Sequence, residues 1–138
     1  MKTFKTNSEL ETQKFASELA KKLKPGDVLA LVGELGGGKT SLVKGLAQGL
    51  GIPKNVCISS PTFVLIHEYF GGRLPLFHFD FYRLEKEGEA LNLNLEEYWN
   101  NNGVCVVEWA DRFPQLFPKQ TRWIYFKFIG ETEREIKC

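Results

Sequence analysis

The stretch GELGGGKTSL, residues 33–42, holds four glycines, one lysine and two hydroxyl side chains in ten positions. It matches the pattern GxxxxGK(S/T), in which Gly33, Gly38, Lys39 and Thr40 occupy the fixed positions. Glycines allow successive backbone N–H groups to surround phosphate oxygens, while the lysine reaches the terminal phosphates and the hydroxyl ligates Mg²⁺. The pattern therefore predicts a phosphate-binding loop of the Walker A type. Its predicted nucleotide contacts are Glu34, Leu35, Gly36, Gly37, Gly38, Lys39, Thr40 and Ser41.

The residues around this loop fit the structural context that such a loop requires. The run VLALV, residues 28–32, is apolar and follows Pro25-Gly26, which is typical of a buried parallel strand after a turn. Beyond the loop, leucines recur at helical spacing at positions 42, 46 and 50, and Gly51 follows as a stop signal. The competing interpretation is a flexible glycine linker or a chance match. Neither accounts for a strand, a loop and a helix in this order.

Glu108 is the candidate metal ligand. Four apolar residues, 104–107, lead directly into it, so it ends a predicted buried strand, where a carboxylate needs a partner. A phosphate loop needs an acid at the end of a neighbouring strand to hold Mg²⁺ opposite the loop hydroxyl. The alternative is an ordinary strand-end carboxylate that faces water. Given the phosphate loop, we favour a Mg²⁺ site formed by Thr40 and Glu108.

Asp80 is the second acidic candidate. In the run FHFDFYR, the side chains of His78, Asp80 and Tyr82 alternate with phenylalanines, so they share one face of a strand. A carboxylate near the γ-phosphate orients water or holds a Mg²⁺-bound water. Alternatively, Asp80 pairs with Arg83 or caps the chain where it leaves the strand. We interpret His78 as a hydrogen-bonded structural residue, and Lys39, Asp80 and Glu108 as the candidate catalytic residues.

Two further positions have both a functional and a structural interpretation. Thr62 lies in the loop SSPTF, and phosphate-loop switches use such a hydroxyl to sense the γ-phosphate, but Ser-Pro-Thr is also an everyday turn. Trp109 follows Glu108 and belongs either to the core or to an exposed contact surface.

The rest of the chain indicates one α/β domain over residues 1–138 with a mixed sheet. Ser8 and Glu11 fit a capping box ahead of an apolar helical stripe, and Asn94 with Glu97 marks a second helix start. Gly71-Gly72 separates two strand-like runs and signals a hairpin. The expected elements are an edge strand within residues 1–6, a helix over 8–24, strands within 62–70 and 74–82, a helix within 91–101, and strands over 104–109 and 122–130.

The composition is that of an ordinary globular domain. The 138 residues are 43% hydrophobic and 25% charged, and the net charge of +1 gives no global electrostatic reason to expect nucleic-acid binding. Three cysteines, Cys57, Cys105 and Cys138, are too far apart to indicate a zinc or disulfide framework, so reduced thiols are expected. No signal peptide and no apolar run of membrane-spanning length are found, so we expect a cytoplasmic protein.

Taken together, the segments GELGGGKT, SSPTFVLIHEY, HFDFYRL and VVEWAD, in this order and at these separations, resemble the TsaE (YjeE) family. The resemblance runs from about residue 8 to the last predicted strand. The runs SPTF and HFDFYR are more specific than the phosphate loop, which many unrelated proteins share. One departure is Gly37, because the family usually has alanine at that position.

The resemblance implies a P-loop NTPase-like, three-layer fold with a mixed sheet of about seven strands flanked by helices. It implies Mg²⁺-dependent ATP hydrolysis in the formation of threonylcarbamoyladenosine at adenosine 37 of tRNA. The implied partners are the TsaB and TsaD proteins, with tRNA reached indirectly through their complex and ATP or ADP as the ligand. By the same resemblance, Lys39 and Thr40 contact phosphates and Mg²⁺, Glu108 is the Mg²⁺ ligand, and Asp80 is the other essential acid. Thr12 and Arg134 are candidates for contact with the nucleotide base.

Two other functions compete with a partner-coupled ATPase. A small-molecule or nucleoside kinase also uses a phosphate loop, but kinases usually carry a lid whose arginines clamp the transferring phosphoryl group. Here the arginines are scattered singly, which argues against a kinase. The third possibility is a nucleotide-gated binding module with negligible hydrolysis.

Overall fold

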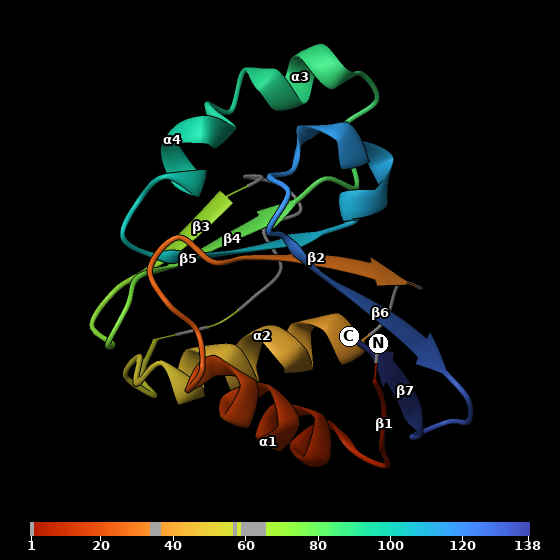
Figure 1. The fold of residues 1–138 in the computed structure, drawn as a ribbon. Helices are drawn as coiled ribbons and strands as arrows, with labels where there is room; N and C mark the ends of the chain where they lie inside the picture. Colours follow the sequence, from red (N-terminus) through yellow and green to blue (C-terminus); the bar gives the residue numbers. More distant parts are fainter. Residues whose placement is uncertain (1, 34–36, 57, 59–65) are drawn as a thin grey trace.

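The computed structural model describes residues 2–33, 37–56, 58 and 66–138, and these form a seven-stranded sheet in the order β1-β7-β6-β2-β5-β4-β3 (Figure 1). The predicted loop residues Glu34, Leu35, Gly36 and Thr62, together with Cys57, lie outside the described residues. The strands are β1 (Thr3–Thr6), β2 (Val28–Gly33), β3 (Ile66–Tyr69), β4 (Leu76–Asp80), β5 (Val104–Glu108), β6 (Arg122–Phe128) and β7 (Arg134–Lys137).

The sheet is parallel in its centre and antiparallel at both sides. Strand β2 pairs in parallel with β5 and with β6, and β5 pairs in parallel with β4. The pairs β3–β4, β6–β7 and β1–β7 are antiparallel. The central strands β2, β4 and β5 are apolar and buried, as expected for parallel strands covered on both faces. The prediction of a mixed sheet is therefore confirmed.

Helices cover the two faces of the sheet and make three layers. The long helices α1 (Glu9–Ala20) and α2 (Gly37–Gly49) lie together on one face, below the sheet in Figure 1. The short helices α3 (Glu87–Leu91) and α4 (Leu95–Trp99) and two 3₁₀ turns, η1 (Ala110–Arg112) and η2 (Pro114–Leu116), lie on the other face. Each face has its own hydrophobic core. The α/β, three-layer architecture agrees with the expectation from the sequence.

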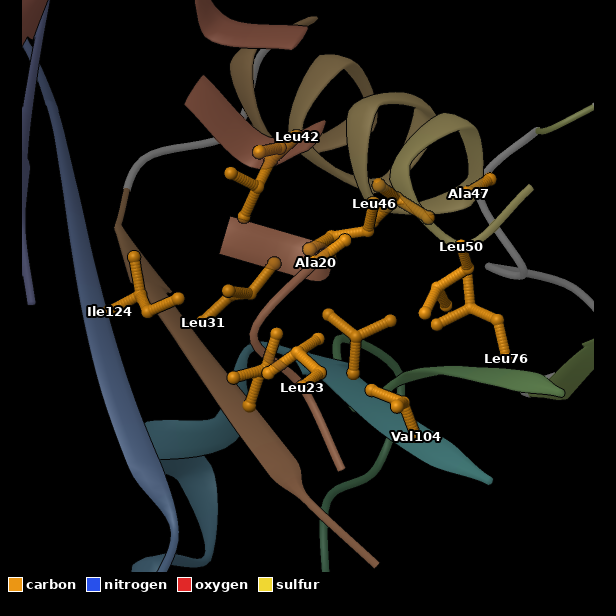
Figure 2. Packing of buried hydrophobic residues seen from close by; sticks show 14 of the residues in the cluster. Ala20, Leu23, Leu31, Leu42, Leu46, Ala47, Leu50, Leu76, Val104 and Ile124 are labelled. Atoms are coloured by element: carbon orange, nitrogen blue, oxygen red, sulfur yellow. The ribbon is translucent and has the colours of Figure 1, made fainter. Parts of the chain in front are cut away.

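The core on the α2 face holds the phosphate-loop helix against the sheet (Figure 2). Leu42, Leu46 and Leu50 are fully buried, as their helical spacing predicted. They pack in one cluster with Leu31 of β2 and Ile124 of β6. Because α2 follows β2 directly, this packing fixes the first turn of α2 over the end of the central strand.

The structure differs from the sequence-based expectation in several local details. Helix α1 ends at Ala20 rather than near residue 24, although Ser8 Oγ accepts the predicted bond from the Glu11 N–H at 3.1 Å. Asn94 precedes α4, but it adopts a left-handed conformation (φ 56°) and its side chain makes no capping bond. Strands β3 and β4 form the predicted antiparallel hairpin, and residues 70–75, which include Gly71-Gly72, join them. Helix α3 and strand β7 are too short to show a periodic signal.

Helices α1 and α2 approach closely because α2 presents glycines to α1. A Cβ atom on Gly45 would lie 2.3 Å from the Gln13 carbonyl oxygen, and one on Gly49 would lie 2.4 Å from the Ser17 carbonyl oxygen. Both distances are far shorter than van der Waals contact, so any side chain at either position would push the helices apart. Gly88 in α3 has no atom within 4 Å of the corresponding position.

We therefore expect Gly45→Ala and Gly49→Ala each to lower the free energy of unfolding by about 1–3 kcal/mol through overpacking. Gly88→Ala is the matched control in another helix. It should leave stability unchanged or raise it by about 0.5–1 kcal/mol, because alanine is the better helix former. Urea unfolding of the three variants measures these differences. Equal stability of Gly45→Ala and Gly88→Ala would contradict the close helix contact.

Candidate nucleotide site

The candidate site lies at the edge of the sheet where the parallel strands end. Glu108 is the last residue of β5 and pairs in register with Leu31 of β2 on one side and with Asp80 of β4 on the other. Asp80 is in turn the last residue of β4. Both carboxylates are nearly buried, with 5% and 3% of the residue exposed. The structure thus brings the two predicted acids side by side, next to the strand that leads into the phosphate loop.

Gly33 shows why the loop must begin with glycine. Its φ of 147° is one that other residues rarely adopt, and a Cβ atom there would lie 2.3 Å from the Phe126 carbonyl oxygen of β6. The chain leaves β2 through this position and enters α2 at Gly37. The packing of β2 against β6 therefore by itself requires glycine at the first fixed position of the motif.

Lys39 carries a buried cation at this edge. Only 2% of the residue is exposed, and among the described residues its Nζ has no hydrogen-bond partner. The Nζ lies 4.2 Å from the centroid of the Trp109 ring. Burial lowers the pKa of Lys39, whereas the charges of Glu108, Asp80 and Asp111 act to raise it. A buried ammonium without a hydrogen-bond acceptor is suited to receive an anion.

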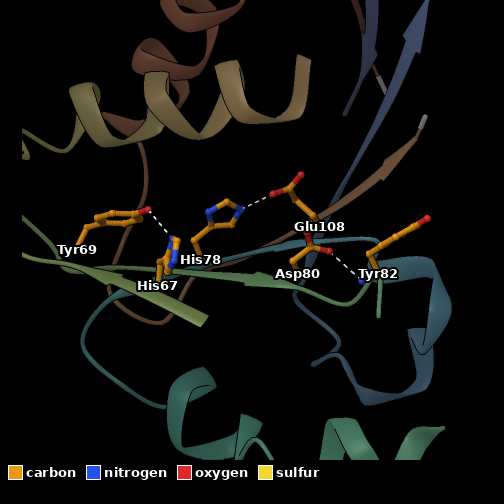
Figure 3. Close-up of polar contacts among 6 residues, drawn as sticks. All are labelled: His67, Tyr69, His78, Asp80, Tyr82 and Glu108. Atoms are coloured by element: carbon orange, nitrogen blue, oxygen red, sulfur yellow. Dashed lines mark hydrogen bonds and ion pairs between the residues drawn. The ribbon is translucent and has the colours of Figure 1, made fainter. Parts of the chain in front are cut away.

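Each carboxylate is oriented by a different donor (Figure 3). His78 Nε2 lies 2.5 Å from Glu108 Oε2, and because a carboxylate only accepts, this nitrogen carries the proton. The Tyr82 backbone N–H donates to Asp80 Oδ1 at 2.8 Å. Asp80 therefore caps the chain as it leaves the strand, one of the structural roles considered for it. His78 is hydrogen-bonded, as predicted.

The hydroxyl residues after Lys39 lie in the first turns of α2. Thr40 is half-buried and Ser41 is buried. Within the described ranges, no group of three or more His, Cys, Asp and Glu side chains could hold a metal ion by itself.

Trp109 lies at the site rather than in the core alone. It is half-buried and adopts a left-handed conformation (φ 59°, ψ 35°), which is uncommon for a bulky residue. Besides contacting Lys39, its ring lies 5.1 Å from the Tyr82 ring and 6.0 Å from the Arg112 guanidinium carbon. Sequence reasoning left Trp109 undecided, and only its position beside Glu108 pointed toward the site.

Thr12 and Arg134 are linked through Thr6, and strands β6 and β2 separate Arg134 from the carboxylates. Thr6 pairs in register with Arg134, and Thr6 Oγ1 lies 2.7 Å from Thr12 Oγ1. Arg134 Nη1 donates to the Thr132 carbonyl at 2.6 Å, while its buried Nε has no partner among the described residues. On β6, Phe126 pairs with Gly33, and Phe128, two residues further along, pairs with Arg134. Arg134 therefore lies at the same edge of the sheet as Gly33. Sequence reasoning missed Thr6, which carries no motif.

The two cysteines in the described part of the chain, Cys105 and Cys138, add no reactive group to this site. Cys105 is buried in β5, where its thiol donates to the Tyr98 carbonyl at 3.4 Å and burial raises its pKa to about 12. Cys138 is half-buried, and both thiols are free. Among the described residues, no helix combines the length and the apolar composition that a membrane span requires.

Comparisons with known proteins agree with this geometry. A family model described as "Threonylcarbamoyl adenosine biosynthesis protein TsaE" matches residues 6–136. The tRNA threonylcarbamoyladenosine biosynthesis protein TsaE of Bacillus subtilis is 47% identical over 133 residues, which are 96% of this chain and 82% of that protein. The protein of the same name from Treponema pallidum is 38% identical over 131 residues, 95% of each chain. The crystal structure of Bacillus subtilis YdiB superposes with a TM-score of 0.83 at 41% identity, covering 98% of this chain and 82% of that one. The chain therefore belongs to the TsaE family.

Proposed function

We propose that this chain binds ATP with Mg²⁺ and hydrolyses it as the nucleotide-dependent component of tRNA threonylcarbamoyladenosine formation in the cytoplasm. The relatives' names refer to this biosynthesis. The observation that carries the nucleotide proposal is the buried Lys39 ammonium, which has no hydrogen-bond partner among the described residues and interacts electrostatically with Glu108 and Asp80. Lys39 is the lysine of the GxxxxGK(S/T) pattern, whose side chain contacts the terminal phosphates of a bound triphosphate.

In this proposal the phosphates and the metal take opposite sides of the site. Lys39 and the backbone N–H groups at the start of α2 bind the phosphates, whose charge the positive end of the helix also favours. Thr40 and Glu108 hold Mg²⁺, which neutralises charge on the phosphate oxygens when it is bound. A hydroxyl and one carboxylate, completed by phosphate oxygens and water, are the donors that Mg²⁺ prefers.

Asp80 orients the attacking water in this proposal. Its Oδ1 is fixed by the Tyr82 N–H, so the carboxylate cannot rotate freely. A fixed carboxylate next to the Mg²⁺ ligand accepts a hydrogen bond from water and directs the water lone pair at the γ-phosphate. The products are ADP and inorganic phosphate.

The nucleotide base is assigned to the cluster of Thr6, Thr12 and Arg134. This cluster lies at the same edge of the sheet as Gly33, beyond strand β6, and β6 and β7 connect the two places. Polar atoms there include the Arg134 Nε, which has no partner among the described residues, and the paired threonine hydroxyls.

Hydrolysis by the isolated chain is expected to be slow, because no arginine finger is identified among the described residues. Arg73 donates to the carbonyls of Ala20 and Leu23 at the end of α1, and Arg112 donates to the Leu84 carbonyl. We assign TsaB and TsaD as the partners that complete the site, and tRNA is reached only through them. The loop containing Thr62 is the proposed switch that senses the γ-phosphate.

Lys39→Met is expected to weaken ATP binding by about 100-fold or more, a loss of roughly 3 kcal/mol, because the phosphates lose their cation. The fold should survive, since the methionine keeps the packed stem. Isothermal calorimetry with ATP and Mg²⁺ measures the affinity. Lys44→Met, at an exposed position of the same helix, is the control and should bind normally. Equal ATP affinities of Lys39→Met and Lys44→Met would contradict the assignment of Lys39 to a phosphate site.

Glu108→Gln and Thr40→Val are each expected to shift the Mg²⁺ dependence of ATP binding to about 10-fold higher concentration, because each removes a metal donor. Titration of ATP affinity against Mg²⁺ measures the shift. Glu96→Gln, on the exposed side of α4, should titrate as the wild type does. If Asp80→Asn shifts the titration and Glu108→Gln does not, Asp80 is the metal ligand.

The purified TsaB–TsaD pair is expected to raise the rate of ATP hydrolysis at least about 10-fold, since missing transition-state groups are worth far more than that in related enzymes. ATP should in turn tighten binding to the pair, because coupling between two ligands is reciprocal. Phosphate release with and without the pair, and pair affinity with and without ATP, measure both effects. If neither responds, a partner-coupled ATPase is the wrong function, and a search for a phosphoryl acceptor follows.

A further inference from the structure

His78 is a buried residue whose only hydrogen bond in the described structure is directed at the proposed metal ligand. None of its surface is exposed, and its Nε2 lies 2.5 Å from Glu108 Oε2. The bond runs diagonally, because His78 pairs in register with Val106 and Glu108 pairs with Asp80. The Glu108 side chain therefore reaches back along its strand to meet the imidazole, as Figure 3 shows.

Packing alone does not account for a histidine at this position. Its neighbours on the same strand face are mixed: Leu76 on β4 and Val106 on β5 are buried and apolar, whereas Asp80 on β4 and His67, its register partner on β3, are polar. A leucine at position 78 would pack against the apolar part of this face without leaving a ring nitrogen unpaired. The histidine instead leaves its Nδ1 buried and without a partner among the described residues, which costs free energy.

The state of Lys39 supplies a second observation. Its Nζ interacts electrostatically with Glu108, and yet it forms no hydrogen bond with that carboxylate or with any other described acceptor. A buried ammonium near a carboxylate that is free to turn would form a salt bridge with it, since both charges are costly to leave unpaired. The bond to His78 instead directs Oε2 of Glu108 toward the imidazole.

We propose that His78 is a positioning residue that holds the Glu108 carboxylate away from Lys39 and so keeps both charges available for ligands. The inference rests on the proposed function, in which Lys39 binds phosphate and Glu108 binds Mg²⁺. With Oε2 occupied by the imidazole, Oε1 is the oxygen that is left to face a cation. Without the imidazole, Glu108 closes onto Lys39 and the two groups neutralise each other before the nucleotide arrives.

Substitutions of His78 distinguish the contribution of its hydrogen-bond donor from that of the size of its ring. The Nε2 of a glutamine side chain reaches the place of the histidine Nε2, whereas the Nδ2 of asparagine reaches only the place of Nδ1. His78→Gln should therefore bind ATP with Mg²⁺ within about 3-fold of the wild type, and His78→Asn and His78→Leu about 10-fold or more weaker. Thermal unfolding of each variant monitors folding. Equal affinities of the Asn and Gln variants would overturn the proposal.

A double-mutant cycle tests whether His78 acts through Glu108. In the Glu108→Gln background, His78→Leu should change the ATP affinity by less than about 2-fold, because the carboxylate it positions is gone. A 10-fold effect in both backgrounds would show that His78 supports the site in another way, and the proposal would be wrong.

A structural readout keeps this inference separate from the proposed function. In a crystal structure of nucleotide-free His78→Asn, Glu108 should form a salt bridge with Lys39, whereas in His78→Gln it should stay apart from Lys39. An unchanged Glu108 position in His78→Asn would overturn the positioning role, whatever the nucleotide affinity. Failure of the wild-type chain to bind ATP would instead overturn the proposed function, and the positions of Glu108 in the two variants would still decide this inference.

Discussion

The parallel pairing of β2 with a strand on each side determines where the candidate site lies. Parallel neighbours end at the same edge of a sheet, so β5 and β4 deliver Glu108 and Asp80 beside the end of β2. The close contact of β2 with β6 then requires glycine at position 33, where the chain turns away. Helix α2 returns over the sheet from that turn and brings Lys39 back to the carboxylates.

Burying three charged side chains at one edge is costly, and the surrounding fold offsets that cost. The desolvation penalty for a buried ion is several kcal/mol even after relaxation, and attraction between opposite charges recovers only part of it. The left-handed Trp109 adds backbone strain of about 1–3 kcal/mol. The leucines of α2, buried against β2 and β6, hold these groups in place. Such a combination of strain and unpaired polar groups is common at functional sites and uncommon elsewhere.

The sequence was sufficient for the features that local patterns encode. The strand β2, the helix α2 and the place of Glu108 at the end of a buried strand follow from apolar runs and leucine spacing. Contacts that depend on strand register or on the distance between helices could not be predicted from the sequence. The diagonal bond from His78 to Glu108 requires the β4–β5 register, and no pattern announced it. Helix α3 and strand β7, with five and four residues, are too short to show a period. The left-handed Trp109 has no sequence signal, because glycine or asparagine is the usual choice there.

The arrangement of charge also bears on how a nucleotide enters such a site. Lys39 contributes one positive charge, and Glu108 and Asp80 together contribute two negative charges when ionised, so the three groups carry a net negative charge. A polyphosphate arriving alone gains the attraction of Lys39 but meets two carboxylates in a region of low dielectric, where repulsion is strong. A divalent cation that arrives with the polyphosphate is attracted by the two carboxylates, so attraction replaces the repulsion. Under the proposed function, the affinities for nucleotide and metal are therefore coupled by electrostatics, and the coupling is strongest when Glu108 is held apart from Lys39.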